Sequence, residues 1–579
     1  MRNNKSIIAV IVAVVAILAV VGIAFGGKMT NMVKEKTMSP VDYYKQVEKS
    51  SIKEDKDKFL KYYEKNYKLI ENKKMNSEAN ISVKVEDGLS ELFASQGAEQ
   101  LSSIKSADIS FNYGMDDKNE GFDISSKIND TDFLSANAYY DSSNKAYAQV
   151  PAISDSYLDF SSMLETEEFA AIKDALATST DAQKSVNPKN IDHLVTVYTD
   201  AIIDSVKNVT KENAKISAGK FEEDATLLTV TMSGTEFCDT AIKLCDTLKK
   251  DEVVKEIITV YADAYKDTST EEFNYDEFVK SLDDAKKEIE DKKADYAEVK
   301  DMLVMKVYVN ASGKIIGRDV TLKAKEDTIS FKSLKATYKN EYGYTLSLST
   351  DKEKELFSVV GNGKMKADTI SGEFDITIGS EDDAKKAKAT LKDCKTIDYL
   401  AGKSSGTVVL ESNDLAPGYK LEVSFDNKGQ DGTYSITVLE KDKKFATATI
   451  TYAVNDKVKL NKPESNAEMI DGSSEEALAN YVAGFDIEKF VNDFTAKAKI
   501  DLSYSDIQGL MGLMGGSLGG SKYDYGTGNY DISSDDYDFN SEDFNLDDYS
   551  TDDSYDGSTD MNLDDFNFEI SETTENSGL

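Results

Sequence analysis

The sequence predicts an α+β protein built on a large curved antiparallel sheet, an unclosed half-barrel covered by amphipathic helices. Short segments in which apolar and polar residues alternate recur through most of the chain, separated by turn signals. Other segments are apolar at every third and fourth residue, so they supply helices that can cover a sheet with one wet and one buried face. An apolar N-terminal segment and an acidic C-terminal tail flank this folded part.

The N-terminal segment Ile7–Phe25 holds no charged residue. As a helix it would reach about 28 Å, close to the hydrocarbon core of a bilayer at about 30 Å. Its length favours a retained anchor, whereas Ala24 and Gly26 would also suit a cleaved signal. We therefore expect residues 1–27 to form a cytoplasmic head and one transmembrane signal anchor. Residues 28–579 are then expected outside the cytoplasmic membrane.

Composition limits the partners. The net charge of −38 argues against nucleic acid, which binds basic surfaces. It favours cations and basic partners. Three cysteines do not make a disulfide framework, and Cys238 and Cys245 would stand about 10 Å apart on one helix. We expect free, partly buried thiols at these positions and at Cys394.

Residues 28–41 are expected to form a juxtamembrane spacer, followed by a helix-rich lobe over 41–303. The first helix carries an aromatic stripe that we expect to pack on a sheet: Phe59, Tyr62, Tyr63, Tyr67 and Ile70. Hairpin strands follow between residues 78 and 151, and a strand pair is expected at 214–233. The further helical stripes are Phe169–Leu176, Ile191–Val206, Phe237–Leu248, Val254–Tyr265 and Phe278–Ile289. Ser233 or Thr235 is expected to cap the third of these, and the motif NPKN to start the second.

Residues 304–500 are expected to form a lobe of consecutive strands, whether in one long sheet with the first lobe or in two sheets. Helices are expected at 380–400 (SEDDAKKAKATLKDCKTIDYL) and at 485–502 (FDIEKFVNDFTAKAKIDL). A short hydrophobic helix at 501–514 precedes the tail 515–579. The tail carries about eighteen acidic residues against the single Lys522, so we expect it to be disordered.

No motif in the sequence names a reaction, and we expect no catalytic residue, cofactor or dedicated metal site. His193 is the only histidine, so it has no companions for a zinc site, and we read it as an ordinary helical residue. Asp536, Asp538 and Asn540 resemble the start of a calcium loop, but Ser541 stands where that loop requires glycine.

Three stretches resemble predicted membrane-anchored surface proteins of Clostridia, a family that is a domain of unknown function. They are SPVDYYKQVEKSSIKEDKDKFLKYYEKNYKLI, NPKNIDHLVTVYTDAIIDSVKNVT and VYVNASGKIIGRDVTLK. The layout is also similar to the LolA-like unclosed barrel of lipoprotein carriers. That second resemblance is architectural and implies a hydrophobic cavity.

The sequence thus favours a non-enzymatic, membrane-anchored extracellular binding protein that shelters a lipid-like ligand or a peptide between sheet and helices. The alternative is a structural or interaction protein of the cell surface, acting through its acidic tail on cations or basic cell-wall components. An enzyme would need clustered carboxylates that only a structure can reveal.

Overall fold

The computed structural model describes residues 38–95, 99–166, 182–265, 274–323, 328–351, 355–366, 368–379, 384–395, 399–414 and 416–506. Contacts divide the chain into a unit of Ala16–Tyr504 and a second unit of Met1–Val15 with Ser505–Leu579. Only two described residues belong to the second unit, so the description below concerns the first. The expected span Ile7–Phe25, the stripe at 169–176, the calcium-like motif and the tail 515–579 lie outside the described residues. Among the helices that the structure does describe, none is long and apolar enough to span a bilayer.

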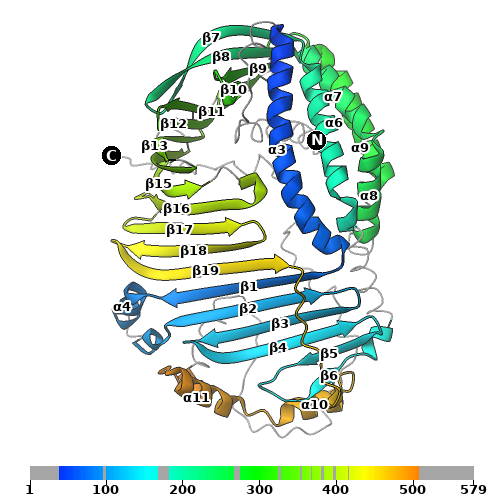
Figure 1. Ribbon diagram of the computed structural model, residues 1–579, viewed down its shortest axis with the longest axis vertical. Coiled ribbons are helices and arrows are strands. Elements are labelled where there is room, and N and C mark those ends of the chain that lie inside the picture. The colour runs from blue at the N-terminus through cyan, green and yellow to red at the C-terminus, as the bar shows by residue number, and fades with distance from the viewer. Residues whose placement is uncertain are drawn as a thin grey trace, which may run out of the picture. The chain divides into compact units, whose positions relative to one another are not determined.

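All described strands belong to one open sheet of twenty strands (Figure 1). Its first meander contains β1 (Met75–Val85), β2 (Ser106–Met115), β3 (Asn119–Ile128), β4 (Thr131–Asp141), β5 (Lys145–Gln149) and β6 (Tyr157–Asp159). Its second meander contains β7 (Asn208–Ala218), β8 (Phe221–Met232), β9 (Leu303–Val309), β10 (Ile315–Lys323), β11 (Thr328–Tyr338), β12 (Glu341–Thr350), β13 (Phe357–Lys366), β14 (Thr369–Ile378), β15 (Lys385–Lys395), β16 (Lys403–Glu411), β17 (Tyr419–Lys428), β18 (Asp431–Glu440) and β19 (Lys443–Asn455). The short strand β20 (Met469–Asp471) pairs in parallel with β6, and every other pairing is antiparallel.

The two meanders meet at a seam between the first strand and the last long one. Ten residues of β1 pair with β19, from Asn76 opposite Asn455 to Val85 opposite Ala446. The spatial order therefore runs from β7 to β19 and continues from β1 to β6. Strands from both halves of the chain thus share one sheet.

The sheet has an apolar face and a polar face, because side chains alternate along each strand. On β1, Ala79, Ile81 and Val83 lie on one face, while Asn80 and Ser82 lie on the other. Register carries this division across the seam, since Ile81 is opposite Ile450 and Ser82 is opposite Thr449. We call the face that carries Ile81 the apolar face and the other the polar face.

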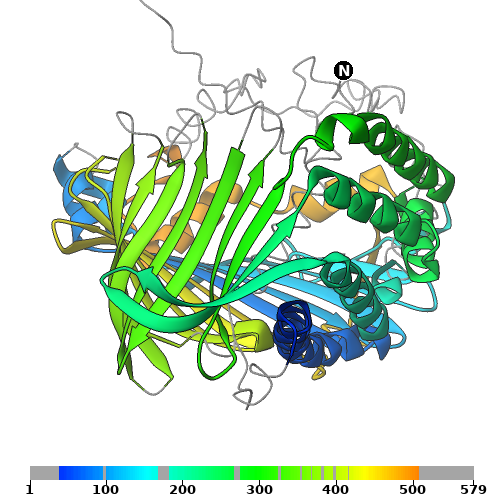
Figure 2. The ribbon, with the colours of Figure 1, turned by 90° about the horizontal axis from the view of Figure 1, so that it is seen from above.

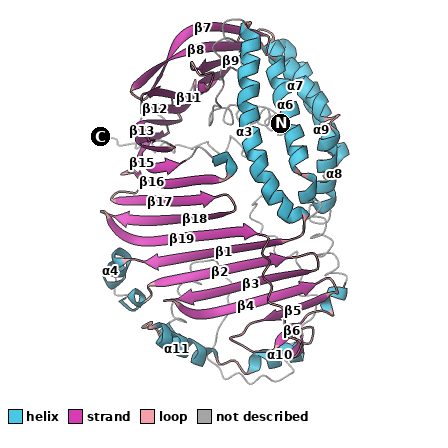
Figure 3. Cartoon of the chain, in the orientation of Figure 1, coloured by secondary structure: helices cyan, strands magenta, loops and turns pink. Residues whose placement is uncertain are grey.

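The helices lie on both sides of the strands and beside one end of the sheet (Figure 3). They are α3 (Pro40–Glu71), α4 (Asp87–Ser95), α6 (Pro188–Ser205), α7 (Gly234–Leu248), α8 (Glu252–Tyr265), α9 (Tyr275–Tyr296), α10 (Glu475–Ala483) and α11 (Ile487–Ala498), with short 3₁₀ turns η1 (Glu99–Ser103), η2 (Met163–Glu165) and η4 (Tyr399–Ala401).

The local sequence explains where two of these helices begin. Asn187 caps α6 ahead of Pro188, and Ser233 with Glu236 forms a capping box on α7. The expectations for NPKN and for Ser233 are confirmed.

Lysine–aspartate pairs fix the antiparallel register of neighbouring helices. On α3, Lys49 Nζ lies 3.0 Å from Asp204 and 3.3 Å from Asp200 of α6, and Lys56 pairs with Asp192 further along. Between α7 and α9 the pairs are Asp239 with Lys293, Asp246 with Lys286 and Lys249 with Asp283. In both helix pairs the partner's number falls as the first helix's number rises, as antiparallel packing requires.

Helices cover the two ends of the apolar face. At one end Tyr43, Tyr44 and Val47 of α3 pack with Val307 of β9 and its neighbours, and Phe237 of α7 packs beside them. At the other end Phe494 and Ala498 of α11 pack against Ile128 and Phe133. Seen from above, the green strands of the second meander stand at a large angle to the blue strands of the first, so the sheet bends between these ends (Figure 2).

One local expectation was wrong, and a second was met only in part, by Tyr62. Residues 385–395, expected to be helical, form β15, in which Ala389 and Leu391 pack on the apolar face with Phe374. Alanine and lysine favour helices, but strands on both sides supply hydrogen-bond partners that outweigh this preference.

The aromatic stripe of α3 packs mostly beside the sheet: the Tyr63 and Tyr67 hydroxyls donate to the carbonyls of Val186 and Lys184. The three cysteines are free and buried, as expected.

Candidate functional site

The middle of the apolar face carries large apolar side chains that remain half exposed. Their exposed fractions lie between 38 and 43%, on Ile81, Val83, Ile109, Phe122, Ile436 and Ile450. We call these six residues the apolar row. Under α3, at one end of the same face, Val307 of β9 is 0% exposed, and at the other end Ile128 and Phe133 are partly buried against Phe494 of α11. The row is therefore the stretch between two covered ends.

Strand register makes the apolar row continuous. Ile81 lies opposite Ile109 on one side and opposite Ile450 on the other. Val83 lies opposite Ala448, which in turn lies opposite Ile436. Phe122 extends the row to β3, with its ring centroid 6.4 Å from that of Phe111. The five strands β18, β19, β1, β2 and β3 span about 19 Å at the usual spacing of about 4.8 Å.

The polar face behind the row is crossed by a strap of residues 456–462. The Lys459 N–H donates to Asn76 Oδ1 at 2.8 Å, and Asn461 donates to Asp123 at 2.6 Å. Gly114 permits this crossing, because a Cβ there would collide with the Lys459 carbonyl oxygen. A hollow of about 420 Å³ lies beside the strap. Its lining amides donate to neighbouring side chains, Asn80 to the Ser110 hydroxyl at 2.8 Å and Asn112 to Asp123 at 3.0 Å, which fits a strap anchor.

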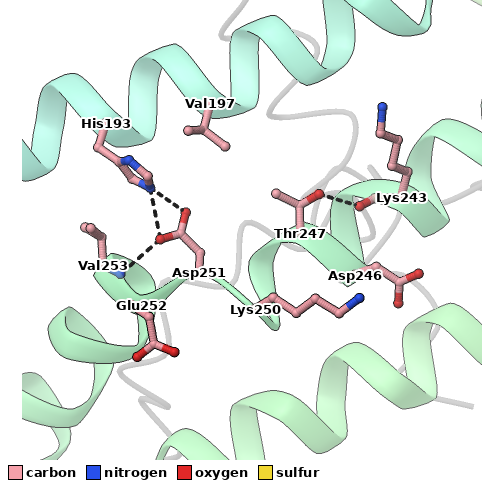
Figure 4. Close-up of a pocket in the computed structure, with 9 residues that line it drawn as sticks. All are labelled: His193, Val197, Lys243, Asp246, Thr247, Lys250, Asp251, Glu252 and Val253. Atoms are coloured by element: carbon pink, nitrogen blue, oxygen red, sulfur yellow. Dashed lines mark hydrogen bonds and ion pairs between the residues drawn. The ribbon is translucent and has the colours of Figure 1, made fainter.

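A second hollow, of about 620 Å³, opens between α6, α7 and α8 (Figure 4). His193 Nε2 lies 3.0 Å from both carboxylate oxygens of Asp251, and the Tyr198 hydroxyl donates to the same carboxylate at 2.9 Å. Asp251 also accepts the Val253 N–H at the start of α8. The carboxylate therefore holds α6 against the beginning of α8.

The electrostatics of this hollow fit a structural role. Burial works to raise the pKa of Asp251, but the hydrogen bonds from Tyr198, His193 and the Val253 N–H outweigh it and hold that pKa below its usual range. Burial and the Asp251 carboxylate raise the pKa of Tyr198 far above its usual range.

A hydrolytic triad would also need a nucleophile beside the histidine. Among the described residues lining this hollow, the one hydroxyl is that of Thr247, and it donates to the Lys243 carbonyl (Figure 4). The His193 side chain is 40% exposed on α6. Over the described ranges, moreover, no three metal-ligating side chains converge.

Comparison of the chain with protein-family models, with curated proteins and with solved structures found no match.

Sequence reasoning missed the apolar row, although the signal was present. The alternation in β1 and β19 identifies Ile81, Val83 and Ile450 as residues of one face. It does not tell which part of that face a helix covers. That information lies in contacts between distant segments, which a single sequence does not display.

Proposed function

We propose that this protein binds the extended hydrocarbon chain of a lipid-like ligand on the apolar row. The observation that carries the proposal is the half-exposed state of six aligned apolar side chains between two covered ends of one face. A contiguous exposed apolar patch of this kind is typical of a binding surface.

The chemistry of the row favours a hydrocarbon chain over a peptide. Its six side chains are aliphatic or phenyl groups, which offer no hydrogen bonds to a peptide backbone; Tyr434, opposite Ile450 and 39% exposed, adds one hydroxyl that suits a polar head group. A long apolar chain needs no hydrogen-bond partners. It would also cover several strands at once, because the row runs across the strands rather than along one of them.

The energy available is moderate. Full burial of a large apolar side chain is worth about 1.5–3 kcal/mol, so covering the remaining two-fifths of six of them gives roughly 4–7 kcal/mol. Each methylene that the ligand buries adds about 0.8 kcal/mol, while the loss of its freedom opposes binding. The sum favours a reversible complex with a chain long enough to cross several strands.

A charge placed on either face of one strand tests the proposal. Ile81→Lys puts an ammonium group in the row, whereas Ser82→Lys puts the same charge on the polar face one residue later. We expect Ile81→Lys to lower the affinity for an uncharged fluorescent acyl probe by tenfold or more, about 1.4 kcal/mol, and Ser82→Lys to leave it within about twofold. Fluorescence titration of the full chain measures both, with circular dichroism to confirm folding. Equal affinities for the two variants would reject the site.

The position of the protein is part of the proposal. The apolar segment Ile7–Phe25 would hold the chain at the outer side of the cytoplasmic membrane, where lipids are within reach. Cell fractionation and protease shaving of intact cells measure this. A full-length product that remained soluble after cell breakage and resisted shaving would contradict it.

A further inference from the structure

Helix α3 presents a line of polar side chains to the interior. Glu48, Ser51 and Asp55 are spaced by three and four residues, so they share one side of the helix. All three are buried, with exposed fractions of 3, 6 and 1%. A line of polar groups turned inward is costly unless each group has a partner.

Only Glu48 has a full partner. Its two carboxylate oxygens accept hydrogen bonds from Arg318 of β10, at 2.6 Å from Nη1 and 2.7 Å from Nη2. Within the described part of the chain, neither oxygen of Asp55 has a hydrogen-bond partner, and the Ser51 hydroxyl has none either. Asp55 is therefore a buried carboxyl group whose charge no hydrogen bond stabilises.

The charged groups around Asp55 are engaged elsewhere. On its own helix, Glu54 pairs with Lys58 at 2.9 Å. The charges that neighbouring elements turn toward α3 are also in pairs or contacts: Arg318 with Glu48, Asp192 with Lys56, Asp200 and Asp204 with Lys49, and Lys211 of β7 over the Tyr43 ring. His193 of α6 is held by Asp251. None of these groups donates a hydrogen bond to Asp55, and Lys58 acts on its charge only through space.

We propose that α3 is a proton-dependent cover of the sheet, docked along its whole length while Asp55 is protonated and released over residues 55–71 when Asp55 ionises. The N-terminal part remains fixed, because Tyr43, Tyr44 and Val47 belong to the largest buried cluster and Glu48 is held by Arg318. Among the described residues, the C-terminal part 55–71 contributes none to a buried apolar cluster, and it is held at its side by the Lys56–Asp192 pair and by the Tyr63 and Tyr67 hydroxyls, which donate to the carbonyls of Val186 and Lys184. Phe59 is 37% exposed, and Tyr62 contacts the loop glycines Gly402 and Gly429.

The direction of the pH effect follows from the burial. Burial raises the pKa of the Asp55 carboxyl to about 7, with opposing smaller influences from Lys58 and Glu54. Because the docked helix binds the proton more tightly than the released one, docking is strongest at acid pH and weakens as the pH rises toward 7. The docking equilibrium should fall by up to about tenfold per pH unit between pH 4 and 7, and level off above that range.

Hydrogen exchange on the full chain in detergent, corrected for intrinsic rates, tests the proposal at pH 5 and pH 8. In the wild type, amides of residues 55–71 should lose up to about 100-fold in protection between these values, while those of residues 40–51 should change little. Asp55→Asn should remove most of this difference. Asp57→Asn is the matched control, because it makes the same change at an exposed position two residues away, and it should behave as the wild type.

Asp55→Leu serves as a second variant, since it removes the titrating group without leaving a buried amide unsatisfied. If both variants keep the wild-type loss of protection over residues 55–71, the proposal is wrong. A wild-type helix whose protection is the same at both pH values would also overturn it. One extension rests on the proposed function: release of α3 would ease entry of a ligand to the apolar face. If the acyl probe did not bind but the hydrogen-exchange result were as expected, this extension would be rejected and the proposed release of α3 would not.

Discussion

The buried pair of Glu48 and Arg318 is the residue-scale feature that fixes α3 on the sheet. Both side chains are at most 5% exposed, and the guanidinium meets the carboxylate through two hydrogen bonds. Such a pair offsets the cost of burying two charges only while both partners are present. It therefore specifies the position of the helix more than it adds to stability.

Removal of one partner should be severe. Glu48→Ala leaves the Arg318 charge buried without a carboxylate, so we expect a loss of about 3–5 kcal/mol in the free energy of unfolding. Urea denaturation followed by circular dichroism measures it. Glu54→Ala is the control, because it removes a carboxylate of the same helix from a pair with Lys58 that is about one-third exposed. It should cost less than about 1 kcal/mol. Equal losses in the two variants would show that the buried pair does not fix the helix.

The sequence did not lead us to predict that Glu48 and Asp55 are buried, although their positions in the helix carry a signal for it. Each falls on the side of α3 that also carries Tyr44, which an amphipathic helix turns toward its core. Arg318 likewise interrupts the apolar positions of β10, between Ile315 and Val320, which are buried on the same face of the sheet. A charge in an apolar stripe indicates a buried partner, but the identity of that partner depends on the packing of segments about 270 residues apart.

At the scale of elements, lysines of α3 facing aspartates of α6 are the feature that sets helix register. Lys49 lies between Asp200 and Asp204, while Lys53, one turn later, is exposed to solvent. Burial and the two aspartates act in opposite directions on Lys49, and the hydrogen bonds prevail to raise its pKa. The interaction is thus electrostatic and sensitive to salt.

Charge reversal tests this register. Lys49→Glu would place three carboxylates together, so it should destabilise the protein by about 1 kcal/mol more than Lys53→Glu, which makes the same change on the solvent side. Thermal and urea unfolding at low salt measure the difference, which should shrink in 0.5 M NaCl. If the difference persisted at high salt, lost packing rather than charge would be the cause.

Elements with a clear period were predicted well, and elements with mixed signals were not. The meanders and the helices at 188–205, 234–248, 252–265 and 275–296 followed from periodicity, because turn residues and caps mark their ends. Strand β15 was misread, since its alanines and lysines suit a helix and its alternation is carried by small side chains such as Ala387 and Ala389. Pairing with β14 and β16 makes this segment a strand, and its local sequence does not indicate that pairing.

At the scale of the whole molecule, the seam between β1 and β19 is the feature that local sequence does not predict. Every strand of both meanders presents the same alternation, so the pattern alone allows many partners for β1. The apolar row crosses this seam, with Ile81 and Ile450 directly opposite each other. The proposed binding surface therefore exists only when the first and last long strands have met.

The seam should form late in folding. A hairpin such as β18–β19 joins residues about ten apart, whereas Ile81 and Ile450 are about 370 residues apart in the chain. By loop-closure entropy alone, joining the distant pair costs about 3 kcal/mol more. In refolding followed by pulsed hydrogen exchange, the amides that link β18 to β19 should gain protection before those that link β19 to β1. Acyl-probe binding should appear together with the later step. If both sets of amides became protected at the same time, the meanders would not be forming ahead of the seam. The binding surface would then arise with the first hairpins rather than after them.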